Sequence, residues 1–153
     1  MTKINKIIYF TFAVIFFMFF DFYFSNLLLN ARFNFYDNDF LSIVLVQNTG
    51  AAFSLLENNS LLLILFAIFA ILLIIIYGIK HIEKFSVIAC FWTALLISGI
   101  GCNLYERIFY GYVRDFFKIN FIEFPIFNIS DIFINIGVIA LIIIIIKNKY
   151  LKK

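Results

Sequence analysis

Two aspartates in the second half of the chain have the residue type and the setting for acid–base chemistry. Asp115 lies between two strongly apolar segments, and Asp131 opens the second of them. An unpartnered carboxylate at membrane depth is energetically costly, so an acid at such a border is a candidate for function. Paired carboxylates can hydrolyse a peptide bond when the ionised one takes a proton from water and the protonated one donates to the substrate. These two acids are therefore predicted to form a catalytic pair.

Each aspartate also has a purely structural interpretation. Asp131, or Ser130 before it, is a suitable N-cap for the apolar helix that follows. Asp115 has Arg114 and Lys118 nearby and fits an exposed salt bridge. Spacing along the chain does not bring the two carboxylates together, so both interpretations stay open at this point.

Further polar residues fall at the same border among apolar neighbours. Asparagine can hold a peptide backbone because its amide both donates and accepts hydrogen bonds. An arginine there can bind a carboxylate or a carbonyl through its planar guanidinium, or reach for lipid headgroups. An aspartate near the outer end of the first apolar segment needs a partner, for which the arginine or the backbone of the outer connectors are candidates. The polar residues at this border are Asn48, Asn103, Arg107, Asn128 and Asp21.

The composition predicts a membrane protein. The chain is 65% hydrophobic and 14% charged, with a mean hydropathy of +1.06, whereas soluble domains are about 25% charged. Its 153 residues leave no room for a separate soluble catalytic module, so 1–153 is expected to be one domain. Four segments approach the roughly 20 apolar residues that a spanning helix needs. They are 7–24, 61–77, 85–101 and 132–146.

The first of these segments follows two lysines and resembles a cleaved signal peptide. Its apolar run is too long, however, and no small-residue cleavage site follows it. It is therefore predicted to be a retained span. The fold class expected is an all-α membrane protein with four transmembrane helices.

The basic residues predict how the chain crosses the membrane. Eight of the twelve lie at the N-terminus, between the second and third spans, or in the C-terminal tail, with Glu83 as the only acid among them. Cytoplasmic loops carry an excess of lysine and arginine, so both termini are expected in the cytoplasm. The long connectors, about 25–60 and 102–130, are then on the outer side. The eight residues are Lys3, Lys6, Lys80, Lys84, Lys147, Lys149, Lys152 and Lys153.

The two outer connectors carry strand-like sequences. Residues 43–46 are β-branched or apolar and precede a turn signal at Asn48-Thr49-Gly50, and residues 51–57 have a helical composition. In the second connector, residues 110–113 and 119–122 combine aromatic and β-branched side chains. A small β platform with a short interfacial helix is expected on the outer face. Gly99 and Gly101 are expected to allow close helix approach or a turn at the exit of the third span.

Other chemistries have less support. His81 is the only histidine and lies in a polar connector, which argues against Ser–His and Cys–His catalysis. Cys90 and Cys102 are interpreted as small apolar residues, because two cysteines and one histidine do not make an ordinary zinc site. Three alternatives remain: a small transporter or channel subunit, a scaffold without chemistry, and a serine–lysine peptidase, which would need Lys118, the only lysine on the outer side. The second and fourth spans contain essentially no polar residues for a transport path.

Three motifs occur in order around the four spans. The first is NTGAAFS at 48–54, and the second is NLYER at 103–107 followed by VRDF at 113–116, with the aspartate eight positions after the arginine. The third is FNISD at 127–131. With Gly111 and Gly137, nearly the whole chain resembles the lipoprotein signal peptidases (signal peptidase II), a family of integral-membrane aspartic endopeptidases of bacteria.

The chain departs from the family pattern near its motifs. The family has a lysine shortly after the aspartate of the first span, and this position is Ser25 here. Cys102 replaces a glycine, Glu106 replaces an aspartate and Ser130 replaces an alanine. These departures leave the catalytic pair intact and concern the role of Asp21 and the fit of the substrate.

The resemblance implies a specific activity. Asp115 and Asp131 would be the catalytic acids, and the polar residues named above would bind substrate and brace the pair. The substrate would be a prolipoprotein, cut just before its diacylglyceryl-modified cysteine at the outer edge of the bacterial cytoplasmic membrane. No metal or organic cofactor and no nucleic acid is expected, membrane lipids are expected partners, and the protein is expected to act as a monomer.

Overall fold

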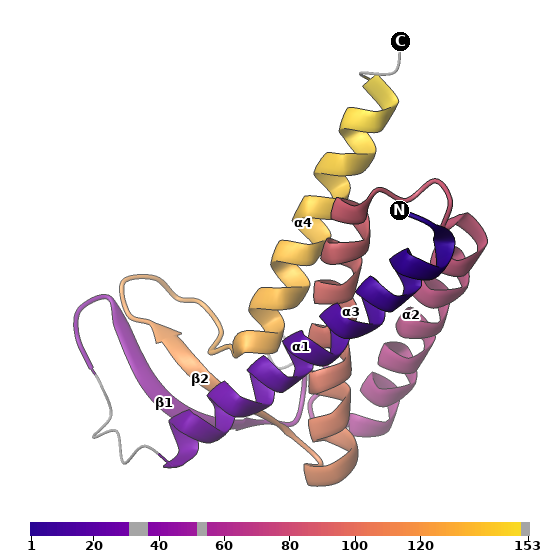
Figure 1. The fold of residues 1–153 in the computed structure, drawn as a ribbon. Helices are drawn as coiled ribbons and strands as arrows, with labels where there is room; N and C mark the ends of the chain where they lie inside the picture. The colour runs from indigo at the N-terminus through magenta and orange to yellow at the C-terminus, as the bar shows by residue number, and fades with distance from the viewer. Residues whose placement is uncertain (31–36, 52–54, 151–153) are drawn as a thin grey trace.

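Four long helices form the body of the molecule (Figure 1). The computed structural model describes residues 1–30, 37–51 and 55–150. Each helix contains an 18-residue stretch apolar enough to cross a membrane, which confirms the four predicted spans. The helices are α1 (Lys3–Asn30), α2 (Ser60–His81), α3 (Val87–Tyr110) and α4 (Ile129–Tyr150).

The helices extend beyond most of the predicted span boundaries. The largest difference is at the end of α3, which continues to Tyr110 instead of stopping near Gly101. Hydropathy identifies residues that face lipid, whereas a helix continues as long as its backbone hydrogen bonds do. The last turns of α3 therefore carry Asn103, Glu106 and Arg107 out of the apolar layer on a rigid element.

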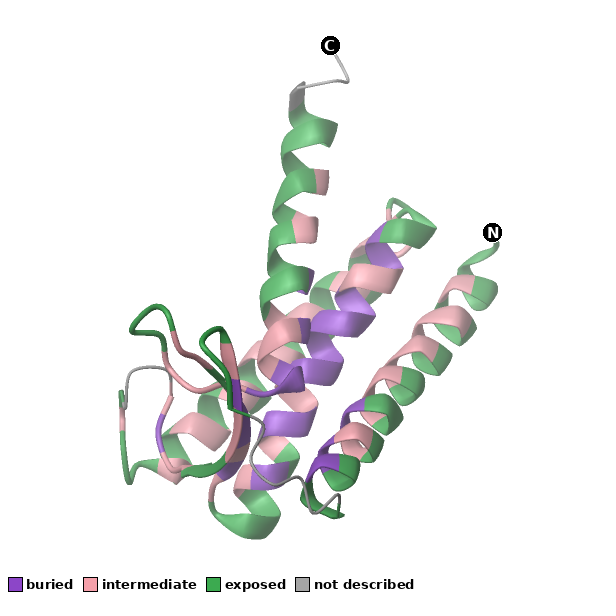
Figure 2. Ribbon diagram, turned by 90° about the vertical axis from the view of Figure 1, so that its left-hand side faces the viewer, coloured by how far each residue is buried: buried purple, intermediate pink, exposed green. Residues whose placement is uncertain are grey.

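Helix α3 is the centre of the bundle. Figure 2 shows buried residues concentrated on it, while α2 contains no buried residue. Two glycines bring α3 and α4 together. A Cβ atom at Gly99 would lie 2.5 Å from the Ser130 carbonyl oxygen, and one at Gly137 would lie 2.9 Å from the Leu96 Cβ. The predicted close approach therefore occurs at Gly99, whereas Gly101 lies within α3 and makes only ordinary contacts with Met18.

The two long connectors form the predicted platform, a two-stranded antiparallel sheet of β1 (Leu41–Asn48) and β2 (Val113–Ile119). Asn48 lies opposite Val113, and a bulge between Ile43 and Val46 interrupts the register. The predicted strand at 43–46 lies within β1. The second strand lies between the two predicted ones, because α3 runs to Tyr110 and ends at Gly111, whose φ is +81°. An aspartate and an arginine inside β2 weakened its sequence signal.

The predicted helix at 51–57 is not found in the part of this range that the structure describes. Residues 52–54 lie outside the described residues, as do Arg32, Lys152 and Lys153. Residues 55–58 form a turn with positive φ at Leu56 (59°) and Asn58 (64°), a conformation that does not continue a right-handed helix.

The two ends of the bundle differ. The sheet lies at one end, and both termini and the α2–α3 connector lie at the other (Figure 1). There the Lys6 ammonium donates to the carbonyls of Ile82, Glu83 and Phe85 at 3.1, 3.1 and 2.7 Å. This lysine ties the start of α1 to the α2–α3 connector.

Candidate active site

The first turn of α4 positions Asp131. Asn128 is the N-cap residue: its Oδ1 accepts a hydrogen bond from the Asp131 N–H at 2.8 Å, and Asp131 Oδ2 accepts one from the Asn128 N–H at 3.2 Å. This is a reciprocal capping arrangement. The N-cap interpretation of Asp131 or Ser130 is therefore wrong, because the cap lies at Asn128. Asp131 Oδ1 accepts from Asn103 Nδ2 of α3 at 2.9 Å.

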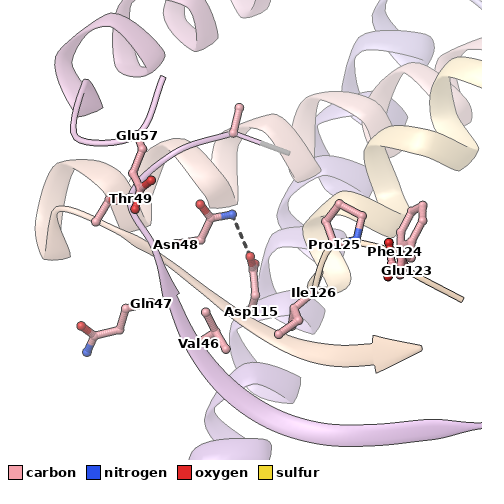
Figure 3. A pocket seen from close by; sticks show the side chains of 11 residues that line it. Val46, Gln47, Asn48, Thr49, Glu57, Asp115, Glu123, Phe124, Pro125 and Ile126 are labelled. Carbon is pink, nitrogen blue, oxygen red and sulfur yellow. Dashed lines mark hydrogen bonds between the residues drawn. The ribbon is translucent and has the colours of Figure 1, made fainter. Parts of the chain in front are cut away.

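Strand β2 positions Asp115. Its side chain is only 2% exposed, and its two oxygens accept from Asn48 Nδ2 at 2.8 Å and from Asn128 Nδ2 at 2.9 Å. Figure 3 shows Asn48 pointing at it from the end of β1. Arg114 pairs instead with Glu106, and Lys118 is exposed. Among the described residues, Asp115 does not form the salt bridge that its neighbours allowed.

Asn128 joins the two aspartates. Besides capping α4 and donating to Asp115, its Nδ2 donates to Asn103 Oδ1 at 3.1 Å. The backbone N–H of Asp131 requires an acceptor, so it fixes which end of the Asn128 amide is oxygen. That orientation makes the Asn128 Nδ2 face Asp115 and Asn103, and makes Asn103 donate to Asp131. One connected network therefore orients both carboxylates.

Both carboxylates line one cavity of about 300 Å³, at the lower end of the usual range for ligand pockets. Asn48, Asn103 and Arg107 lie in the same wall. A second cavity of about 510 Å³ also has Asp115 in its wall and is lined by Gln47, Thr49, Glu57 and Glu123 (Figure 3). The two cavities share Asn48, Ala51, Asp115, Phe124, Pro125 and Ile126.

Arg107 supports the connector above the first cavity. Its Nη2 donates to the Gly50 carbonyl at 2.8 Å, and its Nη1 makes a longer bond of 3.4 Å to the Asn103 carbonyl. Its Nε is buried and has no hydrogen-bond partner among the described residues. A buried N–H without an acceptor is costly, so this N–H is available to donate to an oxygen of a ligand.

Glu106, which the sequence marked only as a departure, joins α3 to β2. It is 5% exposed and accepts from the Arg114 backbone N–H at 2.7 Å and from Arg114 Nε at 2.7 Å, and its ion pair is completed by Arg114 Nη2. The Arg114 guanidinium also stacks over the Tyr110 ring, 5.0 Å from its centroid. This pair sets the direction in which β2 leaves α3, and therefore the position of Asp115.

Asp21 lies behind α4 and does not line the two cavities. It is 3% exposed and accepts a hydrogen bond from Ser130 Oγ at 2.8 Å, and the Cys102 thiol interacts with the same carboxylate. The sequence suggested Arg107 or the platform backbone as the partner of Asp21, but the partner in the structure is Ser130. Two departures from the family pattern, Cys102 and Ser130, therefore meet at the buried Asp21 carboxylate.

Replacing Ser130→Ala is expected to lower Tm by roughly 3–10 °C, because it removes a donor from a buried acid. A double-mutant cycle with Asp21→Asn, followed by thermal unfolding, should show coupling between the two side chains. Ser98→Ala is the matched control, since that buried hydroxyl donates only to the neutral carbonyls of Ala94 and Val14. Additive effects of Asp21→Asn and Ser130→Ala would contradict the contact.

The environment of Asp115 changes its acidity. Burial raises the pKa of Asp115 from 3.8 to about 7; the hydrogen bond from Asn48 opposes this shift and the charge of Asp131 adds to it. Near neutral pH this carboxyl is therefore present in both protonation states. A pair that shares one proton is what general acid–base hydrolysis requires.

Comparisons with known proteins show which family this chain belongs to. Residues 12–147 match the family model described as Signal peptidase (SPase) II. The chain is 39% identical over 103 residues to a lipoprotein signal peptidase of Streptococcus agalactiae, an alignment that spans 67% of this chain and 66% of that protein. It is 35% identical over 111 residues to the lipoprotein signal peptidase of Streptococcus pneumoniae, spanning 72% of each.

Solved structures share the fold. A bacterial membrane enzyme determined by the in meso method at 2.3 Å resolution superposes with a TM-score of 0.80 at 28% identity, covering 97% of this chain and 92% of that one. A second such structure, at 1.9 Å resolution, gives a TM-score of 0.71 at 27% identity, covering 94% and 93%. With four spanning helices and a family match over residues 12–147, this multi-pass membrane protein belongs to the signal peptidase II family.

Proposed function

We propose that this protein is an aspartic endopeptidase that removes the signal peptide from lipid-modified prolipoproteins. The observation that carries the proposal is the single asparagine, Asn128, that binds both Asp115 and Asp131 at the wall of one cavity. The activity named for the relatives from Streptococcus supports the choice of substrate.

In the proposed mechanism the two carboxylates share one proton. The ionised carboxylate takes a proton from a water molecule, whose oxygen attacks the scissile carbonyl carbon. The protonated carboxylate donates to the carbonyl oxygen. When the tetrahedral intermediate collapses, the C–N bond breaks and a proton passes to the leaving amine, so that one water is consumed for each bond cut.

The asparagines act in this mechanism chiefly as positioning residues. Both polar ends of Asn103 are engaged with Asp131 and Asn128, and Asn48 donates to Asp115 while its Oδ1 accepts from the Gly50 N–H at 2.9 Å. Arg107 lines the cavity, and its Nε has no hydrogen-bond partner in the part of the chain that the structure describes. We assign Arg107 the contact with a substrate carbonyl and the asparagines the alignment of the acids.

The proposed substrate is presented from the lipid. The cavity that holds both aspartates also has apolar walls, formed by Leu63, Phe127 and Ile134. An apolar signal helix and two acyl chains would remain in the bilayer while the peptide bond before the modified cysteine reaches the carboxylates. We further propose that both termini face the cytoplasm, because the described lysines at that end outnumber the acids.

The test is cleavage by the purified protein in detergent. A diacylglyceryl-modified precursor is expected to be cut before the modified cysteine, and the same precursor without the lipid is expected to remain intact. Mass spectrometry of the products locates the cut. Equal cleavage of both forms, or cleavage of neither, would contradict the proposal.

The rate of cleavage is expected to fall as pH rises through about 7, the pKa of Asp115. Above that value the pair loses its shared proton, so kcat/KM should decrease about tenfold for each further pH unit. This decrease of kcat/KM reflects the titration of the coupled pair rather than of one residue. It is measured as the pH dependence of kcat/KM for the modified precursor. A profile that stays flat from pH 6 to 9 would contradict a proton shared by Asp115 and Asp131.

A further inference from the structure

A groove lies at the opposite end of the bundle from the aspartates. It encloses a cavity of about 430 Å³ between α2, α3 and α4. Helix α3 forms the floor and packs against both other helices, which form the walls. The walls are mostly apolar, and their aliphatic residues are Leu73, Ile74, Leu141, Ile144 and Ile145.

A second cavity, of about 390 Å³, continues the groove toward the end that carries the termini. The two cavities share Lys84, Phe85, Ala89, Ile144 and Asn148. The apolar wall on α4 runs from Leu141 to Asn148, about 10 Å at about 1.5 Å per residue. A polar mouth therefore leads into an apolar trough that is open to the lipid.

The mouth carries positive charge. Lys84 and Lys147 line it together with the Asn148 amide and the Ser86 side chain, and no acid is present among the lining residues. Among the described residues, neither lysine ammonium has an ion pair or a hydrogen bond. By contrast, Lys6 at the same end of the molecule is fully engaged with backbone carbonyls.

The apolar trough and the basic mouth match different parts of one ligand. Lysines at the cytoplasmic ends of spans occur without any binding site, but here two of them frame a cavity between helices. Basic pockets between transmembrane helices bind the headgroups of anionic lipids. An acyl chain complements the aliphatic walls, and a phosphate complements the two ammonium groups.

We propose that this groove, lined by Lys84 and Lys147 at its mouth, is a binding site for one anionic membrane phospholipid. The headgroup phosphate lies between the two lysines, and an acyl chain lies along α3 between α2 and α4. The site is separate from the carboxylate pair and does not depend on the proposed peptidase activity.

The test is native mass spectrometry of the detergent-solubilised protein titrated with dioleoyl-phosphatidylglycerol or dioleoyl-phosphatidylcholine. Wild-type protein is expected to bind the anionic lipid at least about fivefold more tightly. The double variant Lys84→Gln/Lys147→Gln should lose that preference. The matched control is Lys3→Gln/Lys80→Gln, which removes the same charge from the same end but away from the groove, and it should stay within about twofold of wild type.

Two further arms keep the test decisive. Lys84→Arg/Lys147→Arg retains the charge and should retain the preference, which covers the case in which the glutamine variant fails to fold. Excess glycerol 3-phosphate should not displace the lipid, because it lacks the acyl chain. Equal binding of both lipids, an equal loss in the control variant, or complete displacement by glycerol 3-phosphate would each overturn the proposal.

Discussion

Replacing either Asp115→Asn or Asp131→Asn is expected to reduce cleavage of a lipid-modified precursor by at least about 1,000-fold. Asparagine keeps nearly the size of aspartate, but it replaces one acceptor oxygen by an NH2 group and cannot exchange a proton with water or substrate. The measurement is single-turnover cleavage in detergent, with thermal unfolding of each variant to show that it is folded.

Lys118→Ala is the matched control for these substitutions. Lys118 is exposed on β2, three residues from Asp115, and it lies opposite Ser42, whose hydroxyl donates to Asp37. It is the lysine that a serine–lysine mechanism would require. Cleavage is expected to stay within about twofold of wild type, in line with the small effects of most surface substitutions. Near-normal activity of either aspartate variant, or an inactive Lys118→Ala protein, would reverse the assignment.

The stability of Asp115→Asn gives an independent readout. The folded pKa of Asp115, about 7, is above its ordinary value of 3.8, so the folded state holds a proton that the unfolded state releases between these values. The unfolding free energy of the wild type should therefore fall as pH rises from about 4 to about 7 and then level off. In Asp115→Asn this decrease should be smaller, measured as Tm against pH.

Asn128→Ala is expected to reduce cleavage at least about 100-fold, because small displacements of catalytic groups have effects of this size. The substitution removes the cap of α4 and the hydrogen bonds to Asp115 and Asn103. It leaves both carboxylates in place but no longer aligned. Steady-state kinetics should show the loss mainly in kcat, since the residue positions the acids.

Ser86→Ala separates the loss of a helix cap from the loss of alignment. Ser86 caps α3 at the far end of the bundle, where its hydroxyl accepts from the Ala89 N–H at 3.0 Å. Each capping substitution should cost about 0.5–2 kcal/mol of stability, but only Asn128→Ala should lose activity. If Ser86→Ala reduces cleavage as strongly at the assay temperature, the effect of Asn128→Ala is general destabilisation.

Two of the departures from the family pattern have local physical explanations. Ser130 supplies the donor that the buried Asp21 carboxylate needs, and Glu106 remains an acid that can pair with Arg114. The structure offers no account of the missing lysine after Asp21. Neither Ser130 nor Glu106 takes part in the network that joins Asp115 to Asp131 through Asn128.

By itself the sequence determined the number of spanning helices and the presence of a small β platform built from the two long connectors. Length and hydropathy decide whether a segment can cross a bilayer, and the order of the three motifs identified the family. These are local properties, because they depend on residue type and on short spacing. The sequence also named Asp115, Asp131 and the surrounding asparagines.

Only the tertiary structure decided how those residues act together. The end of α3 at Tyr110, the course of β2 and the capping role of Asn128 each depend on contacts between segments distant in the chain. Hydropathy does not show where α3 ends. Asp115 weakens the alternation of polar and apolar residues by which β2 could have been predicted. Asp115 and Asp131 face one cavity because α3, β2 and α4 converge there, and convergence is a property of packing that spacing along a chain does not contain.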